Sequence, residues 1–234
     1  MLKFKGQGLS LRSIDGERII FIHSKDLYAA VSYTKFTKFT DSPENFATHE
    51  NIIRAVAEKT PAVPFGFNTI VGETIGKGVL FKNYSNLVRA IHAIGGKEEF
   101  IVYVHRDVTK KLQKFSSIAG MTRDREPDQR KKETRAYNKM YDIAGHKRAA
   151  AIHRNFADIA FESRYERLKS DERLLEGYYL VESSKTGLFN QTYNWVQSLY
   201  PELHFFIQGP QPPYSFNPVR ITSANTRLFG SKQT

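Results

Sequence analysis

Few side chains in the sequence combine the types and spacing that an active site requires. His49 and Glu50 are adjacent, but a zinc protease helix carries a second histidine four residues after the first, and here that position is Ile53. The run from Gly72 to Gly78 has three residues between its first two glycines and no hydroxyl residue after its lysine. A phosphate-binding loop needs four residues and a Ser or Thr at those places, so this run predicts a flexible loop.

The remaining candidates for chemistry are equally sparse. His146 and His153 lie seven residues apart, two turns of a predicted helix, whereas metal ligands on one helix are usually one turn apart and need a carboxylate or cysteine partner. The chain has no cysteine, which excludes disulfides and thiolate sites, and no Gly-x-Ser-x-Gly elbow. We therefore expect no enzyme, no metal and no cofactor. An enzyme built from scattered residues stays open; a deep pocket with two perturbed titratable groups would support it.

The composition predicts a folded protein. The chain has 234 residues, of which 40% are hydrophobic and 13% aromatic, enough for one large or two small domains. No apolar run is long enough to span a membrane, and the first residues do not resemble a secretion signal. We expect a cytosolic protein.

The strong positive charge has two interpretations. A net charge of +11 favours an acidic partner such as nucleic acid, or it belongs to a solvated surface that keeps the protein soluble. Acidic residues interrupt the basic runs at 123–126 and 130–135, which weakens a phosphate-binding patch. The solvated surface is therefore the favoured interpretation.

The stretch from Gly209 to Phe216 has the most restricted backbone in the sequence. Its three prolines remove backbone donors and fix φ, so the chain should leave a sheet here along an extended, polyproline-like path. Tyr214 and Phe216 would then point to the same side. Packing beside the last strand is the favoured role of these two rings, and contact with a partner is the alternative.

Local patterns predict the elements of the first half. Runs at 18–23 and 27–33 are rich in β-formers and predict an antiparallel pair. Ser42, Pro43 and Glu44 form a helix start, and apolar residues at three- and four-residue spacing continue to Lys59, with His49 on the apolar face as a packed residue. The stretch 61–69 predicts a short edge strand, and 83–94 a helix ended by a double glycine.

That double glycine marks a predicted boundary between domains 1–95 and 96–234. The second domain should contain, in order, a strand at 98–104, a short helix at 108–115, a long helix from about 137 to 160 with a charged end at 165–169, a strand at 177–182, a helix at 187–199 and a strand at 203–207. The tail after Phe216 is predicted to be loosely held, with an edge strand at 219–221 as an alternative.

Two stretches of the chain resemble the gas vesicle proteins of the GvpF/GvpL type. The family's C-terminal pattern is Gly-Pro-Trp-Pro-Pro-Tyr-Ser-Phe, and its N-terminal pattern is a His-Glu helix followed by Leu-Pro-Leu-Arg-Phe-Gly-Thr. Gln211 replaces the tryptophan, Gly66 the arginine and Asn68 the glycine; asparagine tolerates the left-handed conformation better than most residues. The positions that carry the resemblance are His49, Glu50, Pro64, Phe67, Asn68, Thr69, Gly209, Pro210, Pro212, Pro213, Tyr214, Ser215 and Phe216.

The resemblance implies an α+β protein with an N-terminal mixed α/β sheet domain and a C-terminal modified ferredoxin-like domain with long helices. It also implies a non-enzymatic accessory protein, cytoplasmic and associated with gas vesicles, that binds the small apolar shell protein and other accessory proteins and supports assembly. The partner surface would lie at 64–69 and 214–216, although packing is the favoured role of both. The alternative is an RNA-binding module on a ferredoxin-like sheet. Glu98 and Glu99 oppose it, because an RNA-binding strand would open there with a basic residue and glycine.

Overall fold

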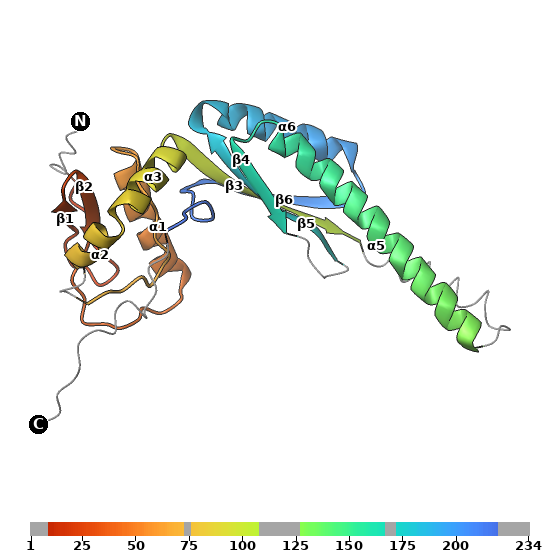
Figure 1. Ribbon diagram of the computed structural model, residues 1–234, viewed down its shortest axis with the longest axis horizontal. Helices are drawn as coiled ribbons and strands as arrows, with labels where there is room; N and C mark the ends of the chain where they lie inside the picture. Colours follow the sequence, from red (N-terminus) through yellow and green to blue (C-terminus); the bar gives the residue numbers. More distant parts are fainter. Residues whose placement is uncertain (1–8, 73–75, 108–126, 167–171, 220–234) are drawn as a thin grey trace, which may run out of the picture. The chain divides into compact units, whose positions relative to one another are not determined.

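The computed structural model describes residues 9–72, 76–107, 127–166 and 172–219, which form a mixed α/β protein (Figure 1). The chain divides into two compact units: unit 1 is Met1–Lys97 with Gln211–Thr234, and unit 2 is Glu98–Pro210. Unit 1 thus contains residues that precede unit 2 in the sequence and residues that follow it. The sequence-based division into 1–95 and 96–234 stays a prediction.

The described part of unit 1 contains a hairpin and three helices. Strands β1 (Ile20–Ser24) and β2 (Leu27–Val31) pair antiparallel, as predicted. Helix α1 (Pro43–Ala57) begins where the start signals place it, because the Ser42 hydroxyl accepts a hydrogen bond from the Asn45 amide at 3.3 Å. Helices α2 (Gly76–Lys82) and α3 (Tyr84–Ile94) follow. The core of unit 1 joins residues of β2, α2, α3 and the C-terminal stretch: Leu27, Leu80, Leu87, Ala90 and Val219.

Two predictions for unit 1 were wrong. The stretch 61–69 forms no strand; it is an irregular segment that ends in a turn, where the Thr69 amide donates to the Gly66 carbonyl at 3.2 Å. The predicted loop at 72–78 is helical from Gly76, the start of α2, while 73–75 lie outside the described residues.

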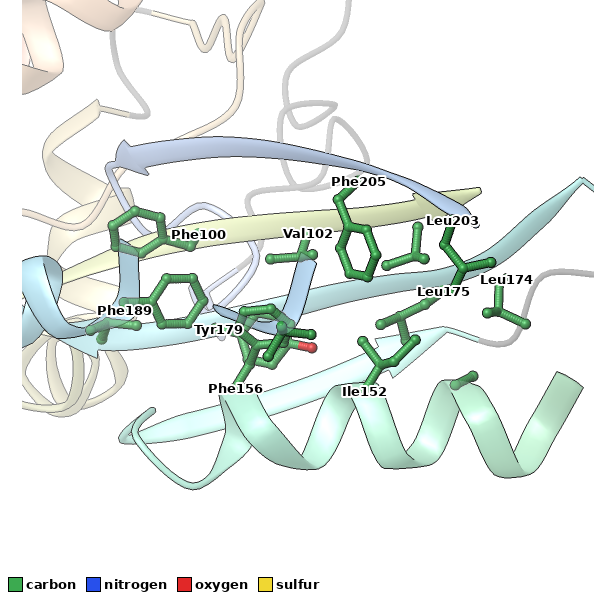
Figure 2. Packing of buried hydrophobic residues seen from close by; sticks show 14 residues of the cluster. Phe100, Val102, Ile152, Phe156, Leu174, Leu175, Tyr179, Phe189, Leu203 and Phe205 are labelled. Carbon is green, nitrogen blue, oxygen red and sulfur yellow. The ribbon is translucent and has the colours of Figure 1, made fainter. Parts of the chain in front are cut away.

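Unit 2 is built on a four-stranded sheet in the order β4-β5-β3-β6. Its elements are β3 (Lys97–Arg106), α5 (Pro127–Ala157), β4 (Glu162–Glu166), β5 (Arg173–Glu182), the short helix η1 (Ser183–Lys185), α6 (Thr186–Leu199) and β6 (Leu203–Gln211). Neighbouring strands run in opposite directions (Figure 2). The predicted long helix, strands and second helix are confirmed, whereas the expected helix at 108–115 lies outside the described residues.

Both long helices of unit 2 pack on one face of its sheet (Figure 1). Because side chains alternate along a strand, Phe100, Val102 and Val104 all point to that face. They meet Phe156 of α5 and Phe189 of α6, and the rings of Phe100 and Phe189 stack with centroids 4.5 Å apart. This core lies wholly within unit 2.

The structure corrects both ends of this sheet. Residues 165 and 166, predicted as the charged end of the long helix, belong to β4, which pairs with β5 and places Tyr165 opposite Gly177. Strand β6 was predicted to end at Ile207 but continues to Gln211 and includes Pro210. Proline is tolerated there because β6 is an edge strand of the sheet.

Candidate partner-binding surface

His49 holds the loop that contains the N-terminal family pattern. Its Nε2 lies 3.0 Å from the Phe65 carbonyl oxygen. The His49 and Phe67 rings form a T-shaped pair with centroids 5.7 Å apart. Phe67 also packs against Phe46 of α1, with ring centroids 4.5 Å apart. His49 is therefore a positioning residue between α1 and the 64–69 loop.

Asn68 fastens the same loop to the segment before α1. Its Oδ1 accepts the Phe39 amide at 2.7 Å and its Nδ2 donates to the Phe39 carbonyl at 3.1 Å, so one side chain satisfies both backbone groups. Asn68 has φ of 62°, the left-handed conformation that the family's glycine adopts freely. The Thr69 hydroxyl closes the turn by donating to the Gly66 carbonyl at 2.5 Å.

Glu50 acts within its own helix. Its carboxylate accepts from the Arg54 guanidinium at 2.6 Å, four residues along α1, and 41% of the Glu50 and 45% of the Arg54 side chain are exposed. Such an exposed pair stabilises a helix by only about 0.3–0.5 kcal/mol. Within the residues that the structure describes, the hydrogen bonds of the Glu50 carboxylate go to Arg54 and not to the 64–69 loop, so Glu50 does not join the group formed by His49, Phe67 and Asn68.

The C-terminal pattern meets the N-terminal one at Pro64. The Asn217 side-chain amide donates to the Pro64 carbonyl at 2.7 Å, although 153 residues separate them. Pro64, Pro212 and Pro213 are buried, and residues 214–216 are half-buried. The extended path predicted through Phe216 was wrong, because the chain turns after Pro213: the Tyr214 amide donates to the Pro212 carbonyl at 2.8 Å.

Gly209 and Pro210 lie away from this junction, in β6. Gly209 has φ of 119°, and a β-carbon there would lie 2.5 Å from the Glu99 carbonyl oxygen of β3. Glycine is required because both the conformation and the close approach exclude a side chain. This part of the pattern is structural.

The residues that could bind a partner form an aromatic surface, made of Phe36, Phe39, Phe46 and Phe67. The rings of Phe36 and Phe39 pack with centroids 5.5 Å apart, and the Phe39 backbone is hydrogen-bonded to Asn68, the neighbour of Phe67. The Phe67 ring packs at a tilt against the Phe46 ring. Phe36 is 55% exposed and Phe46 47% exposed, well above what a core residue shows. Helix α1 contains no buried residue at all.

Sequence reasoning missed Phe36, Phe39 and Phe46 as surface residues. The available signal was the repeat Thr-Lys-Phe-Thr-Lys-Phe-Thr at 34–40, in which lysines alternate with aromatic residues. Lys35 and Lys38 are exposed, and Lys38 lies 3.4 Å from the Asp41 carboxylate. The surface is therefore aromatic with a basic edge.

Burial shifts the pKa of several titratable groups in unit 2. His153 Nδ1 lies 3.0 Å from the Tyr179 hydroxyl, and burial lowers the pKa of His153 and raises that of Tyr179. Burial and a hydrogen bond to Glu176 raise the pKa of Tyr178. Within the described ranges, no three His, Cys, Asp or Glu side chains gather closely enough to hold a metal ion. His146 and His153 accordingly form no such group.

A family model described as gas vesicle synthesis protein GvpL/GvpF matches residues 4–218, nearly the whole chain. The chain belongs to the GvpL/GvpF family. The crystal structure of gas vesicle protein GvpF from Microcystis aeruginosa is similar, with a TM-score of 0.74, 18% sequence identity, and coverage of 91% of this chain and 94% of that one. The crystal structure of gas vesicle protein GvpF from Anabaena sp. PCC7120 is also similar, with a TM-score of 0.71, 17% sequence identity, and coverage of 90% of each chain. No curated protein matches the sequence.

Membership of the GvpL/GvpF family gives the chain a gas vesicle accessory role. Fewer than a fifth of the aligned residues are identical between this chain and either crystal structure, and the similarity shows that the mixed α/β fold is shared. Within the described ranges, no helix is both long and apolar enough to cross a membrane.

Proposed function

We propose that this protein is a non-enzymatic accessory factor that binds the small apolar gas vesicle shell protein through the aromatic surface of unit 1. It acts in the cytoplasm in association with gas vesicles, and other accessory proteins are further partners. The observation that carries the proposal is the exposure of Phe36 and Phe46, joined through Phe39 and Phe67, in a member of a gas vesicle family.

An exposed aromatic surface suits a very apolar partner. Rings supply large apolar contact area at a low cost in side-chain entropy, and contiguous exposed apolar patches usually mark interaction sites. His49 and Asn68 position these rings through hydrogen bonds to the backbone of Phe65 and Phe39. The family-pattern residues 49 and 64–69 therefore position the surface, and Phe67 forms part of it.

We also infer that unit 2 is a modified ferredoxin-like domain. The chain order β3-α5-β4-β5-α6-β6, the sheet order β4-β5-β3-β6 and the two helices on one face support this inference. The long α5 is the modification.

The RNA alternative rests on the net charge and on this sheet. The face away from the helices carries Tyr103 and Tyr178 on the two central strands, where bases could stack. However, the guanidinium groups of Arg164 and Arg173 already lie over the Tyr178 and Tyr103 rings, 5.2 and 5.7 Å from the ring centroids, where a base would stack. Glu162 and Glu166 flank Arg164 on the same face of β4, and the Tyr178 hydroxyl donates to Glu176 at 2.5 Å. Carboxylates in these places oppose phosphate, so the shell protein remains the favoured partner.

A pull-down with purified shell protein tests the proposal. The double variant Phe36→Ser with Phe46→Ser should lose at least about tenfold in binding, because central aromatic anchors dominate interface energies. The control is Phe81→Ser with Phe161→Ser, which are 67% and 59% exposed and belong to α2 and to the segment before β4. The control should bind as the wild type does, and circular dichroism should show that both variants are folded.

Binding should persist as salt rises and in the presence of single-stranded RNA, since apolar contacts carry it. Equal binding by the two double variants would overturn the proposed surface. Capture of RNA alone, lost at high salt, would move the function to nucleic acid.

A further inference from the structure

Helix α5 extends beyond the sheet that it covers and carries much of the positive charge of the chain. Its core residues, Ala149, Ile152 and Phe156, all lie in its second half. The first half continues past the ends of the strands (Figure 1). The helix contains eight Lys and Arg residues against three Asp and Glu, so it is a basic helix with a long exposed part.

The side of α5 opposite the core has an ordered pattern. Starting at Lys132, steps of four and three residues follow one stripe of the helix, the spacing at which one helix meets another. None of the seven positions is acidic, and all but the half-buried Ala150 are exposed. The positions of this α5 stripe are Lys132, Ala136, Lys139, Ile143, Lys147, Ala150 and Arg154.

The four cations of the α5 stripe are not neutralised by the part of the protein that the structure describes. No ion pair joins Lys132, Lys139, Lys147 or Arg154 to a carboxylate of those residues. Arg148, on the flank of the helix, differs: it lies 2.9 Å from Glu202 and packs near the Tyr200 ring. The cations of the stripe lie seven or eight residues apart, roughly 10–12 Å along the axis.

Apolar side chains interrupt these cations. Ile143 is a member of the stripe and is 45% exposed, and the adjacent Met140 is 71% exposed. A phosphate backbone offers no apolar counterpart to such side chains, and its charges repeat more closely than the lysines. A second copy of the same stripe would place lysine against lysine, which is repulsive.

We propose that the α5 stripe docks an acidic amphipathic helix of a protein partner. Glutamates of that helix meet the lysines, and its apolar residues cover Met140 and Ile143. The charge of the stripe selects the partner, and the seven-residue spacing sets its register. This surface is separate from the aromatic surface and does not depend on the proposed shell-protein contact.

The test measures binding of a synthetic helical peptide to the full-length protein by fluorescence anisotropy. The peptide carries Glu at seven-residue spacing with Leu and Ala between, and a scrambled peptide of equal composition is the control. Lys139→Glu with Lys147→Glu should weaken binding by at least about tenfold, because it reverses two central charges. The matched control, Lys131→Glu with Arg135→Glu, has the same net charge, lies on another side of α5 and should change binding by less than about threefold.

Two further arms separate this partner from other polyanions. Met140→Ser with Ile143→Ser keeps every charge and should still weaken binding of the peptide several-fold. A peptide with Lys in place of Glu should bind the Lys139→Glu, Lys147→Glu variant and not the wild type. Equal loss in both charge-reversal variants, equal binding of the scrambled peptide, tighter binding of single-stranded RNA or of anionic vesicles, or no binding of the ordered peptide would each overturn the proposal.

Discussion

Asn68 is the residue on which the geometry of the aromatic surface depends most directly. Its amide bonds to both backbone groups of Phe39, and its φ of 62° turns the 64–69 loop so that Phe67 meets Phe46. Because asparagine tolerates the left-handed conformation, the turn at this position could be predicted from the sequence. No local pattern predicts the hydrogen bonds of Asn68 to Phe39, which lies 29 residues earlier.

We expect Asn68→Ala to destabilise the protein by about 2–4 kcal/mol, since alanine is strained in the left-handed region and both bonds are lost. Asn68→Gly keeps the conformation and should cost only about 1–2 kcal/mol. Urea unfolding curves measure both variants. Equal losses would show that the backbone conformation does not matter at this position.

His153 makes the stability of the protein depend on pH. Burial lowers the pKa of His153 in the folded protein, and its Nδ1 and ring face the Tyr179 hydroxyl and the Tyr165 ring. In the unfolded chain the imidazole takes up a proton near pH 6.5. As pH falls below that value the unfolded state therefore binds more protons, and the free energy of unfolding decreases until the folded pKa is passed.

His153→Gln keeps a hydrogen-bonding group beside Tyr179 but does not titrate. Between pH 7 and pH 5 the variant should lose less stability than the wild type, as measured by thermal unfolding at each pH. The two proteins should show equal pH dependence above pH 7. An equal loss of stability in the variant and the wild type below pH 6.5 would show that His153 does not cause the pH dependence.

At the scale of elements, β6 shows how tightly the family pattern restricts the sheet. Gly209→Ala should destabilise the protein by about 3 kcal/mol or more, because it combines a left-handed conformation with a collision against the backbone of β3. Gly187 in α6 has open space around it and is the control; alanine there should change the stability by no more than about 0.5 kcal/mol. Thermal unfolding of both variants checks the contrast, and similar effects would contradict it.

Elements with local signals could be predicted from the sequence, and those set by distant pairing could not. Helix α1 was predictable because Ser42, Pro43 and Glu44 act within one turn of each other. Strand β4 was missed because its identity comes from pairing with β5, which places Ser163 and Tyr165 opposite Tyr179 and Gly177. The motif residues of the candidate site were found by resemblance, whereas the exposure of Phe46 depends on how α1 packs, and the repeat at 34–40 is the one local signal for the exposure of Phe36.

At the scale of the whole molecule, unit 2 is continuous in sequence and unit 1 is not. All the buried residues of the unit 2 core lie between Phe100 and Phe205. The core of unit 1 includes Val219, and its Pro64 loop is held by Asn217. Unit 2 therefore has all of its core in one continuous segment, whereas unit 1 needs the C-terminal stretch to complete its core.

We expect a fragment of residues 98–210 to fold alone, and a fragment of residues 1–97 to fold only when residues 211–219 are joined to it through a flexible linker. Burial of Val219 and of Pro212 and Pro213 supplies the missing stabilisation. Cooperative thermal unfolding, followed by circular dichroism, is the measurement. Cooperative unfolding of residues 1–95 alone would favour the sequence-based division at the double glycine.

The discontinuity of unit 1 also sets an order of events during translation. A ribosome adds about 5–20 residues per second, so on the order of ten seconds of synthesis separate Pro64 from Asn217. The rings of Phe36 and Phe46 leave the ribosome early, and so do His49 and Asn68, which hold the 64–69 loop, but the bond from Asn217 to the Pro64 carbonyl forms only after residue 217 has emerged. A nascent chain thus carries the aromatic surface before the 64–69 loop has gained its bond to the C-terminal stretch.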